Sequence, residues 1–125
     1  MECDPTAVIP HRPPILCVDR ILQADGQLAV TERWVREGVD VSGGVLWEEG
    51  LLEGFTQTAA VLLSHHVEEK GHRLLKGMLV GIRGLEIRRP VRLNERICYR
   101  VELLKKILPL SVVRCEASCG DEVIA

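Results

Sequence analysis

The chain has 125 residues, of which 46% are hydrophobic and 27% charged, and its formal net charge is −2. This length fits a single domain spanning residues 1–125, and the composition is too apolar for a disordered chain. No run of about 18 uncharged apolar residues is present, which excludes a transmembrane helix, and four aromatic residues are too few for a platform that stacks single-stranded nucleic acid.

The N-terminus and the cysteines indicate the cellular compartment. The first residues are acidic and lack the apolar segment of a secretory signal. The five cysteines form no CxxC pair, and an odd number argues against a disulfide framework and a zinc ribbon. We therefore expect a cytoplasmic protein whose cysteines are reduced and structural.

The first half of the chain predicts a β-hairpin, a loop and a long helix. Residues 15–22 and 27–35 have strand patterns, and Asp25-Gly26 between them is a strong hairpin signal. A loop containing glycine is expected over 37–44. Residues 48–70 then follow a helical period without proline, and their apolar side chains extend well beyond one stripe. Such a helix must be covered on most sides.

Strand patterns return after the helix, at 78–82, 85–89, 96–104 and 110–118, and a turn at Gly120-Asp121 leads into 122–125. One helix among mostly antiparallel strands predicts an α+β domain with a sheet wrapped around the helix. The last strand would have only four residues, which is shorter than usual and leaves open whether the natural chain continues past Ala125.

A narrow stripe of polar and small residues interrupts the apolar helix. At 100° per residue, Gln57, Ala60 and Ser64 all lie within about 40° of Glu53. Burying a carboxylate is costly unless it is paired or protonated, and a carboxyl group in such a site can act as a general acid or base. Glu53 is therefore the first catalytic candidate, and the alternative is a glutamate at the solvated edge of the helix.

The histidines offer no comparable signal. His65 and His66 lie about 18 Å along the helix axis from Glu53, and with His72 they are typical of a solvated helix end. A metal site built from these three residues would need better spacing and a carboxylate ligand, so no metal is predicted.

Three segments carry a family resemblance. Residues 9–22 (IPHRPPILCVDRIL) resemble the opening segment of bacterial β-hydroxyacyl-ACP dehydratases, which have the hot-dog fold. Residues 50–60 (GLLEGFTQTAA) resemble the central helix of that family, with its motif Leu-Glu-x-x-x-Gln-x-x, and residues 79–91 resemble the segment that follows. The resemblance covers nearly the whole chain. It implies a six- or seven-stranded antiparallel sheet wrapped around the helix, and dimerisation through that sheet.

The resemblance also implies a reaction. In the family, the glutamate that matches Glu53 works with a histidine from a Gly-His-Phe-Pro loop, in a tunnel at the dimer interface. The histidine abstracts a proton next to the thioester carbonyl, and the carboxyl group assists the departure of the β-hydroxyl as water. In this chain, residues 37–44 contain no histidine. The sequence is also similar to a divergent, aryl-polyene-associated subgroup that lacks this motif and carries a tryptophan before the helix, as Trp47 does.

We therefore expect an acyl-thioester-binding protein in which Glu53 is the acid and Gln57, one turn later, orients it. A backbone amide at Gly43 or Gly44 would polarise the thioester carbonyl, and Trp47 would contact the substrate. No cofactor is expected besides the phosphopantetheine, of ACP or CoA, that carries the substrate.

Two alternatives remain open at this stage. One is a thioesterase that uses Glu53 alone or together with Asp40. The other is a non-catalytic subunit paired with an active dehydratase. Both a homodimer and a heterodimer with a related hot-dog subunit are compatible with the sequence.

The charge distribution indicates a partner. Residues 70–106 contain eleven Lys and Arg against three Glu, a balance of +8 that leaves −10 for the rest of the chain. A basic half suits an acidic partner such as an acyl carrier protein, and Arg88 and Arg89 are the predicted contacts. The alternative is an ordinary solvated strand face. Nucleic acid is not expected, because no binding motif accompanies the arginines.

Overall fold

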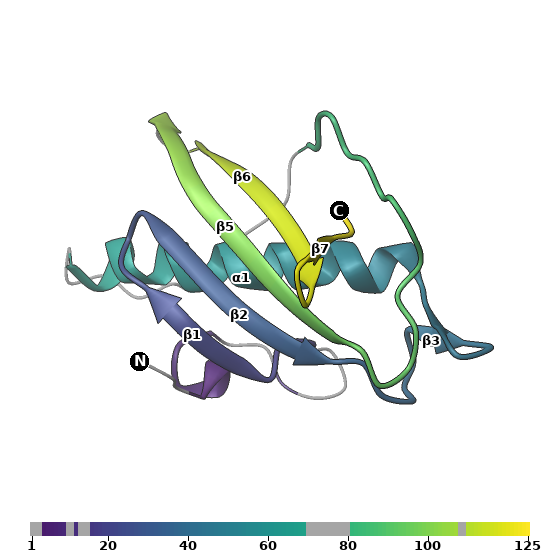
Figure 1. Ribbon diagram of the computed structural model, residues 1–125. Coiled ribbons are helices and arrows are strands. Elements are labelled where there is room, and N and C mark those ends of the chain that lie inside the picture. Colours follow the sequence, from purple (N-terminus) through teal and green to yellow (C-terminus); the bar gives the residue numbers. More distant parts are fainter. Residues whose placement is uncertain (1–3, 10–11, 13–15, 70–80, 108–109) are drawn as a thin grey trace.

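The computed structural model describes residues 4–9, 12, 16–69, 81–107 and 110–125. The helix α1 (Glu48–Glu69) crosses one face of a five-stranded antiparallel sheet with the order β1-β2-β5-β6-β7 (Figure 1). The other elements, in chain order, are η1 (Pro5–Ala7, a 3-10 helix), β1 (Arg20–Ala24), β2 (Leu28–Trp34), β3 (Val41–Ser42), β4 (Val45–Leu46), β5 (Arg96–Ile107), β6 (Leu110–Cys119) and β7 (Glu122–Val123).

The hairpin β1–β2 is confirmed, and its turn has the predicted chemistry. The Asp25 carboxylate accepts the backbone N–H groups of Gln27 and Leu28, both at 3.0 Å, and Gly26 takes a left-handed φ of 85°. The first strand, however, begins only at Arg20. Residues 16–19 precede it in an irregular conformation, with a single ladder-like bond from the Asp19 N–H to the Glu32 carbonyl.

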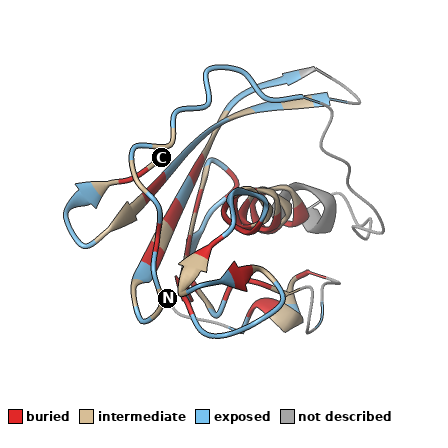
Figure 2. Ribbon diagram, turned by 90° about the vertical axis from the view of Figure 1, so that its right-hand side faces the viewer, coloured by how far each residue is buried: buried red, intermediate tan, exposed pale blue. Residues whose placement is uncertain are grey.

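Side chains from α1 and the inner face of the sheet form the apolar core. No residue from 51 to 64 is exposed, as expected for a helix that is apolar on most sides. Figure 2 shows the buried face of the helix turned toward the sheet. The largest fully buried side chains include Tyr99, Ile21, Leu62, Ile97, Ile124 and Gln57.

The helix comes closest to the sheet at Gly54. A β-carbon at this position would overlap Cζ and Oη of Tyr99 on β5. The Tyr99 ring packs edge-to-face against Phe55, with 5.4 Å between the ring centroids. One turn further along the helix, the hydroxyl groups of Thr58 and Thr31 lie 2.7 Å apart. Glycine therefore lets the helix rest directly on the first half of β5, at Tyr99.

The segment before the helix differs from the predicted loop. It contains the short hairpin β3–β4, whose turn residues Gly43 and Gly44 have φ values of 62° and 77°. Two backbone hydrogen bonds fasten this hairpin to residues 91–93: the Leu46 N–H donates to the Val91 carbonyl at 2.8 Å, and the Leu93 N–H donates to the Gly44 carbonyl at 3.0 Å.

The prediction of a strand at 85–89 is wrong. This segment is irregular and mostly exposed, and 46% of the Leu85 surface is exposed to solvent. The backbone N–H of Arg88 donates to the carbonyl of Ile124, the residue just after β7, at 2.8 Å. The pattern had the right residues for a strand, but a strand also needs a neighbour along its length. Of the predicted strand at 78–82, residues 78–80 lie outside the described part of the chain, and 81–82 are not in a strand.

The strands 96–104 and 110–118 are confirmed as β5 and β6, and both extend beyond their predicted ends. The larger sheet has five strands in the described residues rather than the six or seven that the resemblance implied. None of the described helices is long and apolar enough to cross a membrane.

Candidate functional site

Glu53 and Gln57 form a connected pair on α1. The Gln57 side chain is fully buried, and its Nε2 donates to Glu53 Oε1 at 3.0 Å. The other end of the same amide, Oε1, accepts the backbone N–H of Cys17 at 2.8 Å. Gln57 therefore links the half-buried Glu53 carboxylate to the chain just before β1, and it fixes the position of that carboxylate.

A second polar pair lies on the other side of Cys17. Arg33 faces inward from β2, and its Nη2 lies 3.0 Å from Oδ1 and 2.9 Å from Oδ2 of Asp40. Asp40 also bounds the helix, because a β-carbon at Gly50 would come within 2.6 Å of Asp40 Oδ2. The pair thus ties the loop before β3 to both the sheet and the first turn of the helix.

The surroundings of Arg33 hold two unsatisfied polar atoms. Arg33 Nη1 and Tyr99 Oη are buried and have no hydrogen-bond partner among the described residues. Burial raises the pKa of Tyr99 well above its ordinary value. Burial acts to lower the pKa of Arg33, but the nearby Tyr99 and Asp40 outweigh it and the pKa is raised. Arg33 is therefore a permanent cation whose side chain is largely buried.

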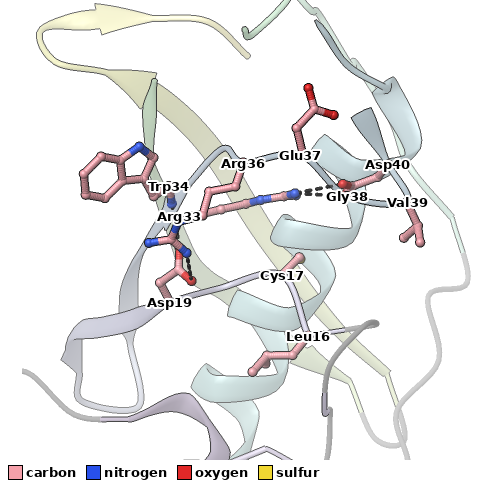
Figure 3. Close-up of a pocket in the computed structure, with 10 residues that line it drawn as sticks. All are labelled: Leu16, Cys17, Asp19, Arg33, Trp34, Arg36, Glu37, Gly38, Val39 and Asp40. Atoms are coloured by element: carbon pink, nitrogen blue, oxygen red, sulfur yellow. Dashed lines mark hydrogen bonds and ion pairs between the residues drawn. The ribbon is translucent and has the colours of Figure 1, made fainter. Parts of the chain in front are cut away.

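A cavity of about 300 Å³ opens beside these groups (Figure 3). Burial raises the pKa of the Cys17 thiol to about 12; Arg33 opposes this, and Glu53 and Asp40 add to it. Cys17 is therefore not a nucleophile at neutral pH, and its backbone N–H is the functional group that it contributes. The residues that line the cavity are Leu16, Cys17, Asp19, Arg33, Trp34, Arg36, Glu37, Gly38, Val39 and Asp40.

A second cavity, of about 430 Å³, is lined by three of the other predicted site residues, Trp47, Arg88 and Arg89. Trp47 and Arg88 both line it, and 50% of the Trp47 surface remains exposed. Its wall is mainly apolar, with Leu51 from the helix and Ile87 from the irregular segment. Neither cavity is lined by Glu53 or Gln57. The structure therefore brings Trp47 and Arg88 together, but it does not bring them to the Glu53–Gln57 pair.

Arg89 is committed to contacts within the chain. Its Nη1 and Nη2 donate to the two carboxylate oxygens of Glu95 at 2.9 and 2.8 Å, and its Nε donates to Glu122 at 3.1 Å. Among the described residues, the Arg88 side chain makes one ion pair, an exposed one with Glu86 at 3.4 Å. Of the two arginines predicted to contact a carrier protein, Arg88 is thus the one whose side chain is available.

The predicted glycines sit at the tip of the β3–β4 hairpin, and a β-carbon at either would meet no atom within 4 Å. Residues 37–44 carry no histidine. His11 and His72 lie outside the described residues, as do the side chains of His65 and His66. No group of three or more His, Cys, Asp or Glu in the described part of the chain could hold a metal ion.

Comparison with known proteins decides the family. The sequence model of the ApeP-like family, described as ApeP dehydratase, matches residues 3–125. The chain belongs to the ApeP-like dehydratase family.

Relatives of this ApeP-like chain include curated dehydratases. It is 29% identical over 127 residues to the 3-hydroxyacyl-[acyl-carrier-protein] dehydratase FabZ of Bacillus pumilus, covering 93% of this chain and 83% of FabZ. It is 31% identical over 133 residues to FabZ of Herpetosiphon aurantiacus, covering 98% and 89%. The predicted β-hydroxyacyl-ACP dehydratase-like family is confirmed.

A solved structure confirms the hot-dog fold of this ApeP-like chain. It superposes on a chain of "The Dehydratase Heterocomplex ApeI:P from Xenorhabdus doucetiae" with a TM-score of 0.87, at 19% identity, covering 98% of this chain and 85% of the other.

Sequence reasoning missed Arg33 as a site residue. Its signal was parity, because Ala29, Thr31 and Arg33 on β2 and Val35 just after it lie at alternate positions, and all four are buried. A charged residue on the inward parity of a strand requires a partner. That partner, Asp40, was noted only as a helper of Glu53 in a thioesterase.

Proposed function

We propose that this chain is a cytoplasmic dehydratase subunit that acts on 3-hydroxyacyl groups held as thioesters on an acyl carrier protein. The observation that carries the proposal is the Glu53–Gln57 pair. The Glu53 carboxyl group is half-buried, and a hydrogen bond from a fully buried amide orients it. A carboxyl group held in this way suits a general acid, which must reach one substrate atom in one geometry.

In the proposed elimination, a base removes a proton from the carbon next to the thioester carbonyl. The electrons of that C–H bond form the new double bond, the C–O bond to the β-hydroxyl breaks, and Glu53 protonates the departing oxygen to give water. The base then releases the abstracted proton to solvent and the anionic Glu53 takes one up, so both groups return to their starting states. Gln57 holds the carboxyl group throughout.

The base is proposed to come from a related hot-dog subunit. Residues 37–44, where the dehydratases resembled by this sequence carry their histidine, contain none. The similar Xenorhabdus chain belongs to a dehydratase heterocomplex, which supports a paired arrangement. Trp47, Gly43 and Gly44 do not line the first cavity. We therefore assign them to substrate contacts at a site that the partner subunit completes, with Arg88 beside Trp47 in the second cavity.

The test is a dehydration assay on a 3-hydroxyacyl carrier protein, using this chain alone and mixed with a hot-dog dehydratase subunit of the same organism that has the Gly-His-Phe-Pro loop. We expect enoyl product only from the mixture, and at least a hundredfold loss with Glu53→Gln, in line with the usual contribution of general acid catalysis. Glu49→Gln, an exposed carboxylate one turn earlier, is the control and should keep full activity.

Each other outcome has a defined meaning. Undiminished turnover with Glu53→Gln excludes a catalytic role of Glu53. Full activity of this chain alone excludes the proposal that a partner subunit supplies the base. Release of a free thiol instead of enoyl product identifies a thioesterase. A stable complex whose activity depends only on the partner identifies a non-catalytic subunit.

A further inference from the structure

Trp34 is an exposed aromatic residue in contact with two cations. It ends β2, and 40% of its surface is exposed. The guanidinium carbons of Arg36 and Arg96 lie 5.2 and 4.7 Å from the centroid of its ring, within cation–π distance. Arg96 is directly opposite Trp34 in the β2–β5 ladder. We call these three residues the Trp34 surface.

The charges around the Trp34 surface are not equally neutralised. Arg36 pairs with Asp19 at 3.4 Å, and Asp19 also accepts the backbone N–H of Trp34 at 2.6 Å. Arg96 makes no ion pair among the described residues, and its guanidinium packs against the Trp34 ring. Figure 3 shows the carboxylate of Glu37 turned away from Trp34 and Arg36. One exposed cation is therefore held in place without a counter-charge.

The Trp34 surface borders the first cavity. Trp34 and Arg36 line that cavity together with Cys17. The Cys17 backbone N–H is hydrogen-bonded to Gln57, and Gln57 is hydrogen-bonded to Glu53. The cavity therefore extends from the Trp34 surface, where Asp19 and Glu37 also line it, to a residue that lies two hydrogen bonds from the proposed acid.

We propose that the Trp34 surface docks an acyl carrier protein at the phosphate that begins its pantetheine arm, and that the arm enters the first cavity toward Gln57 and Glu53. This inference rests on the proposed function. A phosphodiester forms strong charge-assisted hydrogen bonds with guanidinium groups, and Trp and Arg are the residues that most often dominate protein–protein interfaces. Arg89 cannot take this part, because Glu95 and Glu122 occupy its guanidinium.

The experiment compares carrier-bound with carrier-free substrates in the assembled complex. KM is measured for a 3-hydroxyacyl group on the carrier protein and for the same group on N-acetylcysteamine, which has neither phosphate nor carrier. For Arg96→Ala and Trp34→Leu we expect KM for the carrier-bound substrate to rise about tenfold, the scale of one interface hot spot. KM for the N-acetylcysteamine thioester should stay unchanged. Arg100→Ala, an exposed arginine further along β5, is the matched control and should change neither value.

Direct binding keeps failure of this proposal distinct from failure of the proposed function. The Kd of the holo-carrier protein is measured for wild type, Arg96→Ala, Arg88→Ala and Glu53→Gln. We expect weakening of about tenfold with Arg96→Ala, and weaker binding of the apo-carrier, which lacks both the pantetheine arm and its phosphate. If Arg96→Ala weakens carrier binding but the assembled complex shows no turnover, the proposed dehydratase function is contradicted and the proposed docking surface is supported.

Three results would overturn the proposal. The first is an equal rise in KM for both substrates with Arg96→Ala, because a general structural change would produce it. The second is weaker holo-carrier binding with Arg88→Ala but not with Arg96→Ala, which would move docking to the second cavity. The third is binding of coenzyme A as tight as that of the holo-carrier and equally sensitive to Arg96→Ala, which would make the free cofactor the ligand.

Discussion

The close approach of α1 to β5 makes Gly54→Ala a sensitive test of the packing. In an exposed helix this substitution would stabilise the chain by about 1 kcal/mol through helix propensity. Here the new methyl group would overlap Cζ and Oη of Tyr99, whereas carbon atoms in contact normally lie about 3.5–4.0 Å apart. Tyr99 is fully buried and packed against Phe55, so its ring has little room to retreat.

Overpacking of this kind costs about 3 kcal/mol at the upper end of its usual range. Subtracting the propensity gain of about 1 kcal/mol leaves a net loss of about 2 kcal/mol in the free energy of unfolding. The assay is equilibrium unfolding in urea, followed by far-UV circular dichroism. The reasoning is refuted if Gly54→Ala unfolds at the same urea concentration as wild type or at a higher one.

Two comparisons separate the overlap from other effects. In a Tyr99→Leu background the ring is gone, so Gly54→Ala should cost much less than in wild type, and the double-mutant cycle measures the difference. Gly50→Ala should cost less than Gly54→Ala, because its β-carbon would overlap its neighbours less deeply: Asp40 Oδ2 at 2.6 Å, Leu46 Cδ1 at 2.8 Å and Asp40 Cβ at 2.9 Å.

Two further predictions concern polar contacts. Gln57→Leu leaves the Cys17 N–H without its acceptor and should lower the free energy of unfolding, measured by urea titration, by about 1–3 kcal/mol. Ser64→Ala, which loses a hydrogen bond within the helix, should lower it less. Equal losses for the two variants would contradict the bridging role of Gln57. The Arg89 hydrogen bonds, opposed by partial burial, lower the pKa of Glu95 below its ordinary value of 4.5. The contribution of the ionised Glu95 to folding stability is therefore present above pH 4.5 and is lost as the pH falls through the lower pKa of Glu95 in the folded state. The stability difference between wild type and Glu95→Gln should shrink over that acidic range in thermal melts, and a difference that does not vary with pH would contradict this.

Local signals in the sequence were sufficient for several elements. The Asp25-Gly26 turn, the helix from Glu48 and the long strands β5 and β6 all follow from periodicity and turn chemistry. The Glu53–Gln57 pair was also visible, because two residues one helical turn apart lie on the same face in any α-helix. These features depend on neighbours in the chain, which the sequence specifies directly.

Only the tertiary structure decided the features that depend on distant partners. Residues 85–89 have a strand pattern but pair with no strand in the described part of the chain, and the Arg89 guanidinium is occupied by Glu95 and Glu122. Arg33 finds Asp40 across a loop, and Cys17 supplies a backbone N–H to Gln57 forty residues away. Periodicity identifies which side chains face inward, but it does not specify which of them meet, because strand register and the placement of the helix on the sheet set those contacts.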